Sequence, residues 1–376
     1  GPWRQNRLSP NALTLDYAQF SKDGGRTWSV SEPVLAFSDR AAQSQPYNGP
    51  LLVRYPFRAE ALPRNCSLVL EQPEMYASIR VNGRELRFGQ GEETPGKNTG
   101  TTSKKTPGDV SDGEPAGFYL DRAFRTAEIT PLLKKGDNEI VLALDFRSAV
   151  PSSYDADERY GTEIESVYLT GDFAVRGKEV APPLADSWRN RSPYLQRTAP
   201  VNRLTGFVLT DEPAQVEGDM TLQGYPFFAG SMTLEKEFDL ERTDSAARYF
   251  LTFPACEATV IGINVNGTDL SPLFASPWEA DVTQWLRPGS NKICLTLTNT
   301  LRNVLGPHHH KGGEFTEVRP VTFRAGEDVS NTMTGEPVGE RDWYDARLKG
   351  RAALWRDAYH IIPSGLLAAP EIRRER

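Results

Sequence analysis

The stretch AEITPLLKKGDNEIVLAL, residues 127–144, has a close counterpart in ADVTQWLRPGSNKICLTL, residues 280–297. In each copy an acidic residue, a β-branched pair and a short apolar segment lead to a glycine and an asparagine, and an alternating apolar run closes the stretch. Asn138 of the first copy aligns with Asn291 of the second. This internal similarity predicts two related β-units in tandem, because each repeat of a pattern encodes one structural unit.

An Asn-Gly pair precedes each copy, at Asn82-Gly83 and at Asn266-Gly267, directly after an alternating apolar run. Asn-Gly suits the positive φ angles of a type I′ turn, so each pair predicts a tight hairpin. Short apolar runs between turn residues continue along the chain, which is typical of a sandwich. We therefore predict an all-β protein with two tandem antiparallel β-sandwiches, divided into 1–50 (N-terminal hairpin and linker), 51–176 (first sandwich), 177–203 (linker) and 204–376 (second sandwich).

Composition excludes some classes of partner. The chain has 376 residues, 38% hydrophobic and 25% charged, with a net charge of -7. Because no basic stripe accompanies this acidic balance, we expect no nucleic-acid partner. No apolar run is long enough to cross a bilayer, so we expect no membrane span either.

The compartment is not decided by the cysteines. Cys66, Cys256 and Cys294 lack CxxC spacing, and we expect buried free thiols. The opening Gly1-Pro2 resembles a protease scar and has no apolar signal core, so we expect the native start, with any secretion signal, to lie upstream. We favour a periplasmic or extracellular location over the cytoplasm.

Several segments fall outside the repeat. Residues 11–36 predict a hairpin, in which SKDGGRTW at 21–28 fits a single Asp-box pattern and is best interpreted as a self-stabilised turn. The small, polar residues 37–50 predict a linker. A polar insertion at 88–117 favours a mobile loop, and a charged stretch at 340–358 predicts a short helix.

Other stretches extend a likeness to a known family. With the V-N-G turn and the repeat above, these are GFYLDRAFR (117–125), QGYPFFAG (223–230), LGPHH (305–309) and IPSGLL (362–367). Together they resemble the tandem galactose-binding-like jelly-roll region at the C-terminal end of large bacterial glycoside hydrolases. The likeness is to the sugar-binding domains of family 2 and to rhamnosidase-like proteins of family 106.

The resemblance implies a carbohydrate-binding or accessory region that positions or binds a glycan for an upstream catalytic domain absent from this chain. We expect no glycosidase activity from the chain alone, although the residues leave its status as an enzyme open. One alternative is a stand-alone polysaccharide-binding module. The other is a glycosidase with its site between the two sandwiches, using Asp172, Glu279 or Glu314.

Aromatic residues beside glycine supply the first candidate contacts. Tyr225 and Phe227 lie between glycines, and aromatic rings can stack on the apolar face of a sugar. The alternative is that this segment plugs the end of the sandwich. Trp278 and Glu279 precede the D-V-T strand, at the rim in the resembled fold, and are further candidates for ligand binding.

Histidines supply the remaining candidates. His308 and His309 lie in a Gly/Pro-rich loop and could contact sugar, pack between domains or serve only the loop. We expect no metal there, because adjacent imidazoles of an extended chain point in different directions. No cofactor is expected, and structural calcium at Asp155 and Asp157 is left open. We predict that Tyr225, Trp278, His308 and His309 converge on one concave surface of the second sandwich.

Overall fold

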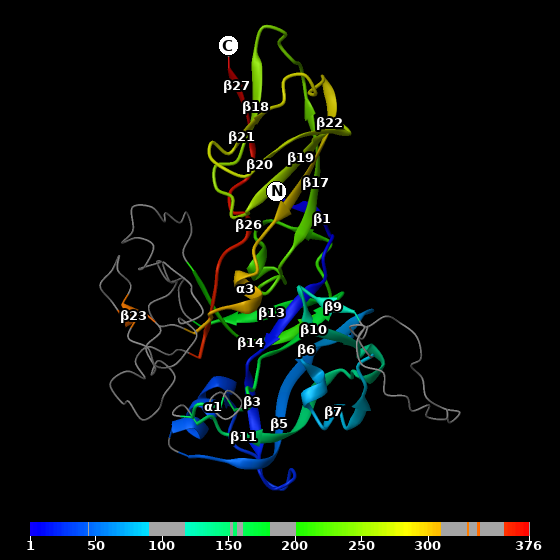
Figure 1. Cartoon of the computed structure of the whole chain (residues 1–376). Coiled ribbons are helices and arrows are strands. Elements are labelled where there is room, and N and C mark those ends of the chain that lie inside the picture. The colour runs from blue at the N-terminus through cyan, green and yellow to red at the C-terminus, as the bar shows by residue number, and fades with distance from the viewer. Residues whose placement is uncertain are drawn as a thin grey trace, which may run out of the picture. The chain divides into compact units, whose positions relative to one another are not determined.

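The structure is a computed structural model that describes residues 1–43, 45–89, 117–150, 153–155, 161–180, 201–309, 329–330, 337–338 and 357–375. Two compact units are present. The first unit is residues 14–171, and the second unit combines residues 1–13 with 172–376. Almost all regular structure is strand, which confirms the predicted all-β class (Figure 1). None of the helices within the described residues has the length and apolar character that a membrane span requires.

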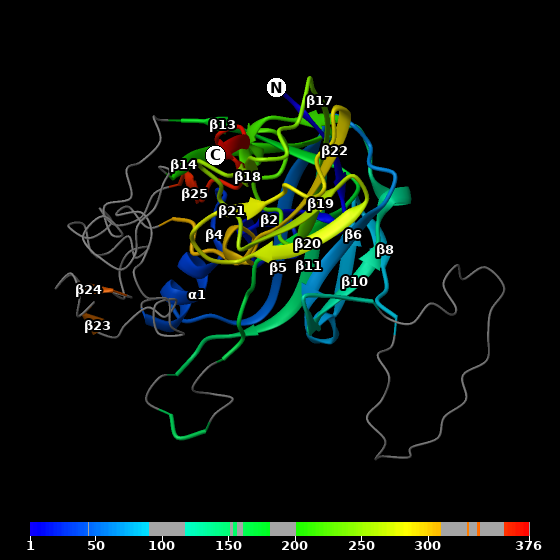
Figure 2. The same cartoon turned by 90° about the horizontal axis from the view of Figure 1, so that it is seen from above.

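The first unit contains two antiparallel sheets, seen in blue to teal in Figure 2. One runs in the order β5 (Asn48–Ala59), β11 (Gly136–Arg147), β7 (Ser78–Val81) and β8 (Arg84–Leu86), with β3 (Tyr17–Ser21) beside β5 and β4 (Glu32–Pro33) beside β3. The other runs β12 (Val167–Gly171), β6 (Cys66–Glu71), β10 (Asp121–Glu128) and β9 (Phe118–Tyr119). Two single turns of 3-10 helix, η1 (Pro73–Met75) and η2 (Thr130–Leu132), link strands, and β2 (Asn11–Leu15) spans the boundary between the units.

Alternation explains the core of the first unit. Val53 and Tyr55 of β5 are fully buried, and the register places them opposite Leu142 and Ile140 of β11, which are also buried. Residues directly opposite each other share a face, so these side chains form one apolar layer while the residues between them point away.

The second unit is a sandwich of two further sheets. A six-stranded sheet runs β15 (Gln215–Val216), β1 (Trp3–Arg7), β17 (Ser231–Leu240), β22 (Gly289–Thr298), β19 (Val260–Val265) and β20 (Thr268–Leu273). A three-stranded sheet runs β21 (Glu279–Asp281), β18 (Arg248–Thr252) and β27 (Glu371–Glu375). Buried residues from both sheets, such as Leu295 and Leu251, belong to one hydrophobic core.

Smaller elements complete the second unit. The strand β14 (Asn202–Thr210) pairs with β13 (Ala174–Glu179) and with β25 (Tyr359–Ile361). The remaining elements are η4 (Met220–Leu222), α3 (Arg302–Leu305), the pair β16 (Gly218–Asp219) and β26 (Gly365–Leu366), and the pair β23 (Val329–Ser330) and β24 (Pro337–Val338).

A pair of asparagines links the Asn-Gly hairpin to the closing strand in the first unit. The buried Asn138 amide donates to the carbonyls of Lys134 (2.8 Å) and Gly136 (3.0 Å), and its Oδ1 accepts from Lys134 N–H (3.0 Å). Asn82 donates to Asn138 Oδ1 (2.8 Å) and to the Leu132 carbonyl (2.8 Å). Asn138 therefore closes the loop before β11, and Asn82 holds the β7–β8 hairpin against that loop.

The second unit repeats this arrangement bond for bond. Asn291 donates to the carbonyls of Arg287 (2.8 Å) and Gly289 (2.9 Å), and its Oδ1 accepts from Arg287 N–H (3.0 Å). Asn266 donates to Asn291 Oδ1 (2.8 Å) and to the Trp285 carbonyl (2.7 Å). We call Asn82 with Asn138, and Asn266 with Asn291, the asparagine clamps.

The hairpins themselves have the predicted turn geometry. Asn82 and Gly83 have φ of 50° and 77°, and Asn266 and Gly267 have φ of 52° and 90°. Consecutive positive φ values are those of a type I′ turn, which suits the right-handed twist of the flanking strands. The turns join β7 to β8 and β19 to β20.

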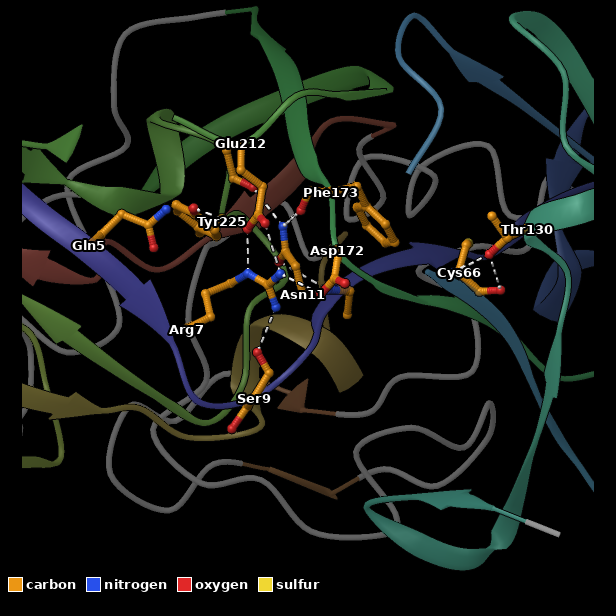
Figure 3. Close-up of polar contacts among 12 residues, drawn as sticks. Gln5, Arg7, Ser9, Asn11, Cys66, Thr130, Asp172, Phe173, Glu212 and Tyr225 are labelled. Atoms are coloured by element: carbon orange, nitrogen blue, oxygen red, sulfur yellow. Dashed lines mark hydrogen bonds and ion pairs between the residues drawn. The ribbon is translucent and has the colours of Figure 1, made fainter. Parts of the chain in front are cut away.

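A threonine in each unit makes a second shared contact. Thr130 Oγ1 accepts from Cys66 N–H (2.7 Å) at the start of β6, as Figure 3 shows, and Thr283 Oγ1 accepts from Tyr249 N–H (2.8 Å) in β18. These threonines occupy the same place in the two sequence copies. The repeat therefore records a shared set of backbone contacts.

The predicted linker at 37–50 is wrong in its first part. Residues Val34–Gln43 form the helix α1, with Val34, Phe37 and Ala41 buried. Apolar residues at i, i+3 and i+7 cover one side of a helix, and here they pack inward. The Phe37 ring stacks on Phe20 of β3 at 4.1 Å between centroids.

The Asp-box segment closes on itself. Asp23 accepts hydrogen bonds from Thr27 N–H (3.0 Å), Thr27 Oγ1 (2.7 Å) and Ser21 Oγ (2.8 Å), as in a self-stabilised turn. The predicted mobile loop at 88–117 and the predicted helix at 340–358 lie almost wholly outside the described residues.

The asparagine clamps yield a stability prediction. Replacing Asn138 or Asn291 by alanine should lower the free energy of unfolding by about 2–3 kcal/mol, because each change removes the hydrogen bonds that the buried amide makes to the preceding loop and to the partner asparagine. Urea unfolding measures the loss, and hydrogen exchange should localise it to β11 in one variant and to β22 in the other.

Asn6→Ala is the matched control, since Asn6 is exposed on β1. It should change stability by less than about 0.5 kcal/mol. Clamp variants as stable as the control would show that the clamps are not needed for the fold.

Candidate functional site

Part of the predicted aromatic and histidine site comes together in the second unit. The Phe227 ring lies 5.7 Å from His308, and His309 lies 4.4 Å from Tyr359, between ring centroids. The loop holding both histidines is fixed to the chain, because His308 Nε2 is 2.9 Å from the Asn303 carbonyl oxygen and the His308 carbonyl accepts from His360 N–H. The rings therefore pack against one another in a fixed arrangement.

Tyr225 lies in the core of the same unit. Its ring contacts Phe228 at 6.0 Å, and its hydroxyl donates to Glu212 at 3.4 Å. Tyr225, Phe227, His308 and His309 are at most 4% exposed. The structure thus places these four side chains in the interior and does not present them as a concave surface, so ligand binding by them stays a prediction.

Trp278 and Glu279 lie elsewhere in the second unit. Trp278 is half-buried against the hydrophobic core, and its carbonyl accepts from Phe253 N–H (3.0 Å). Glu279 begins β21 and forms an ion pair with Arg373 of β27 (2.8 Å). Their predicted role in ligand binding also stays a prediction.

Of the three carboxylates considered for a catalytic role, two form ion pairs with arginines and one lies outside the described residues. Glu279 is paired as above, and Glu314 lies outside the described residues, as does Asp157 of the loop considered for calcium. Asp172 accepts from Arg7 (3.0 Å), whose guanidinium also forms an ion pair with Glu212 and donates to the Ser9 carbonyl (2.8 Å) (Figure 3).

The arginine at this point is a structural anchor. The Arg7 side chain is only 8% exposed, so its charge must be compensated locally, and Asp172 and Glu212 supply that charge. Beside it, the Asn11 amide donates to the carbonyls of Phe173 and Gly224, both at 2.8 Å (Figure 3). These bonds tie the first residues of the chain into the second unit.

Sequence reasoning missed a group of acids and phenols in the first unit. We call it the carboxylate–tyrosine cluster; its members are Glu71, Glu163, Glu165, Tyr55, Tyr76, Tyr119 and Tyr168. Glu163 is exposed and the other two acids are half-buried, so the carboxylate side of the cluster reaches solvent. The four tyrosines are buried.

The strand register explains how the cluster forms. Val69 of β6 lies opposite Tyr168 of β12, and Glu71 lies opposite Phe124 of β10. Because residues two apart on a strand share a face, Glu71 and Tyr168 lie on the same face, and Phe124 contacts Tyr168 edge to face at 5.8 Å. Tyr55 of β5 donates its hydroxyl proton to the Glu165 carbonyl at 2.7 Å.

The electrostatics of this cluster are unusual. Burial, with the neighbouring charges of Glu163 and Glu71, raises the pKa of Glu165 from 4.5 to about 7. Burial and the charges of Glu163 and Asp121 raise the pKa of Glu71 as well. Desolvation and like charge both disfavour the ionised carboxylate. Carboxyl groups with pKa values shifted in this way are candidates for a functional site.

The tyrosines respond to the same environment. Burial raises the pKa of Tyr119 to about 12, and burial with the charge of Glu165 raises the pKa of Tyr168 further. These phenols stay protonated at neutral pH and can act as hydrogen-bond donors. Sequence alone could not assemble the site, because Glu71 and Glu165 are distant in the chain and meet only through strand pairing.

Comparisons with known proteins give a weak likeness. No family model matches this sequence, and no curated protein matches it. Among solved structures it is similar to a rhamnosidase from Novosphingobium sp. PP1Y, with 13% identity over 87% of this chain and 23% of that chain and a TM-score of 0.27. A β-D-mannosidase from Dictyoglomus thermophilum gives 14% identity over 77% and 31%, with a TM-score of 0.27.

A β-glucuronidase from Ruminococcus gnavus gives 11% identity over 78% of this chain and 40% of that chain, with a TM-score of 0.28. All three names are those of glycoside hydrolases, and the chain spans less than half the length of each. Matches at this level of structural similarity establish neither a shared fold nor a shared activity.

Glu165 yields a prediction about pH. Its pKa is raised on folding, so the unfolded chain loses this proton at lower pH than the native protein, and the free energy of unfolding falls as pH rises from about 4.5 to about 7. Glu165→Gln removes this penalty. The free energy of unfolding of the variant, minus that of wild type, should rise by about 1–3 kcal/mol from pH 4.5 to pH 8. The partial exposure of Glu165 reduces this rise.

Urea unfolding of both proteins across this pH range measures the gain. Glu85→Gln is the control, since Glu85 is an exposed acid on β8 of the same unit. If the difference in free energy of unfolding between Glu165→Gln and wild type stays constant from pH 4.5 to 8, Glu165 titrates as a solvated carboxylate.

Proposed function

We propose that this chain is a carbohydrate-binding or accessory β-sandwich region of a glycoside hydrolase, which binds or positions a glycan for a catalytic domain outside this sequence. The observation that carries the proposal is the pair of asparagine clamps. They give a structural basis to the V-N-G turn and G-x-N signature on which the resemblance to galactose-binding-like domains depends.

The contacts of Asp172 and Glu279 favour a non-catalytic role for these two carboxylates. A glycosidase needs one carboxylate as acid and another as base or nucleophile across the same sugar, roughly 5–10 Å apart. Asp172 and Glu279 are instead each engaged by an arginine, Arg7 and Arg373, in contacts that hold strands together. A catalytic use of either would first require that contact to break.

A panel of neutral oligosaccharides titrated by calorimetry tests glycan binding, and aryl glycosides test turnover. We expect binding without turnover. Trp278→Ala should weaken binding by about 1–3 kcal/mol, the loss typical of an aromatic anchor. Because Trp278 is half-buried, the thermal unfolding midpoint of the Trp278→Ala variant must be shown to lie above the assay temperature.

Tyr154→Ala serves as the aromatic control, because Tyr154 is fully exposed in the first unit. Absence of binding across the panel would contradict the binding role and leave positioning alone. Turnover abolished by Asp172→Asn or Glu279→Gln would instead establish the enzyme alternative.

A further inference from the structure

Within the described residues, the carboxylate–tyrosine cluster gathers acidic groups without a basic partner. In the part of the chain that the structure describes, no lysine or arginine forms an ion pair with Glu71, Glu163 or Glu165. Asp121 adds further negative charge beside Glu71. Buried or half-buried charges are normally paired, so this site is electrostatically suited to a cation supplied from outside.

A second, independent feature of the cluster indicates a hydroxyl-bearing ligand. The Tyr119 hydroxyl is buried, its residue is only 8% exposed, and none of the described groups hydrogen-bonds to it. Tyr119 acts electrostatically on Tyr168, which places the two phenols close together within the cluster. A buried hydroxyl without a partner costs free energy that a ligand hydroxyl would recover.

The tyrosine rings fit the same kind of ligand. Tyr76 and Tyr168 lie near the Glu71 and Glu165 carboxylates. The face of an aromatic ring attracts a cation, and a carboxylate beside it adds charge-assisted hydrogen bonds. Glu163 is exposed, so a ligand can approach from its side of the cluster.

We propose that the carboxylate–tyrosine cluster of the first unit binds a protonated amine carried on a polyhydroxylated ring, as in a 2-amino-2-deoxy sugar of a de-N-acetylated glycan. This inference rests on the proposed carbohydrate-binding function and names a substrate class for it. The ammonium would neutralise Glu71 and Glu165, and a ring hydroxyl would pair with Tyr119.

Calorimetric titration of the whole chain with three trisaccharides tests the proposal: the glucosamine trimer, its N-acetylated form and cellotriose. We expect the glucosamine trimer to bind about ten-fold or more tightly than either neutral trimer, because only it carries ammonium groups. Binding should also release protons at about pH 6, where the ligand amines are already protonated and Glu165 still carries its proton, since a nearby cation favours the ionised form of Glu165; titration in buffers of different ionisation enthalpy detects this release.

Glu71→Gln and Glu165→Gln should each weaken binding of the glucosamine trimer about ten-fold, whereas the exposed Glu85→Gln should not. Glu165→Gln is expected to stabilise the fold, so its loss of binding would not come from unfolding. Equal affinity for the acetylated and free trimers, or full affinity in both variants, would overturn the proposal. If the chain binds neutral and amino trimers equally well, and Trp278→Ala weakens both, this inference is wrong and the proposed function still holds.

Discussion

The asparagine clamp is the contact on which each sandwich depends. The register of an antiparallel hairpin and the strand beside it is set by the apolar pattern of the buried face and by the geometry of the turn. Here one buried amide closes the loop before the long strand, and a second amide at the type I′ turn holds the hairpin to that loop. Asparagine suits this use because its side chain offers both a donor and an acceptor to the backbone.

The features that could be predicted from the sequence are those set by contacts between residues close together in the chain. The Asn-Gly turns, the long strands and the all-β class were predictable, because alternation and turn chemistry act over a few residues. The helix α1 was missed although Val34, Phe37 and Ala41 have helical spacing, because the boundary between the predicted hairpin at 11–36 and the predicted linker at 37–50 divides this short helix. The attachment of residues 1–13 to the second unit depends on partners far along the chain, such as Glu212, and no local pattern predicts such a contact.

The candidate site shows the same limit more sharply. Aromatic and histidine residues beside glycine have the composition of a sugar site, yet Phe227 and His308 are used for packing. Composition cannot distinguish a ring that faces solvent from one that fills a core, because both need apolar surface. The carboxylate–tyrosine cluster depends on strand register, which brings acids from β6 and from the segment before β12 to one face.

The placement of β1 and β27 has a consequence for the order of folding. β1 lies inside the six-stranded sheet of the second unit, and β27 pairs with β18 in the opposite sheet, so segments from both ends of this sequence build one sandwich. The first unit is continuous in sequence, whereas the second is built from two separate segments of the chain. β1 cannot complete its pairing until both β15 and β17 have been made, and β18 stays open on one side until β27 arrives, which gives chaperones and proteases an interval in which to act.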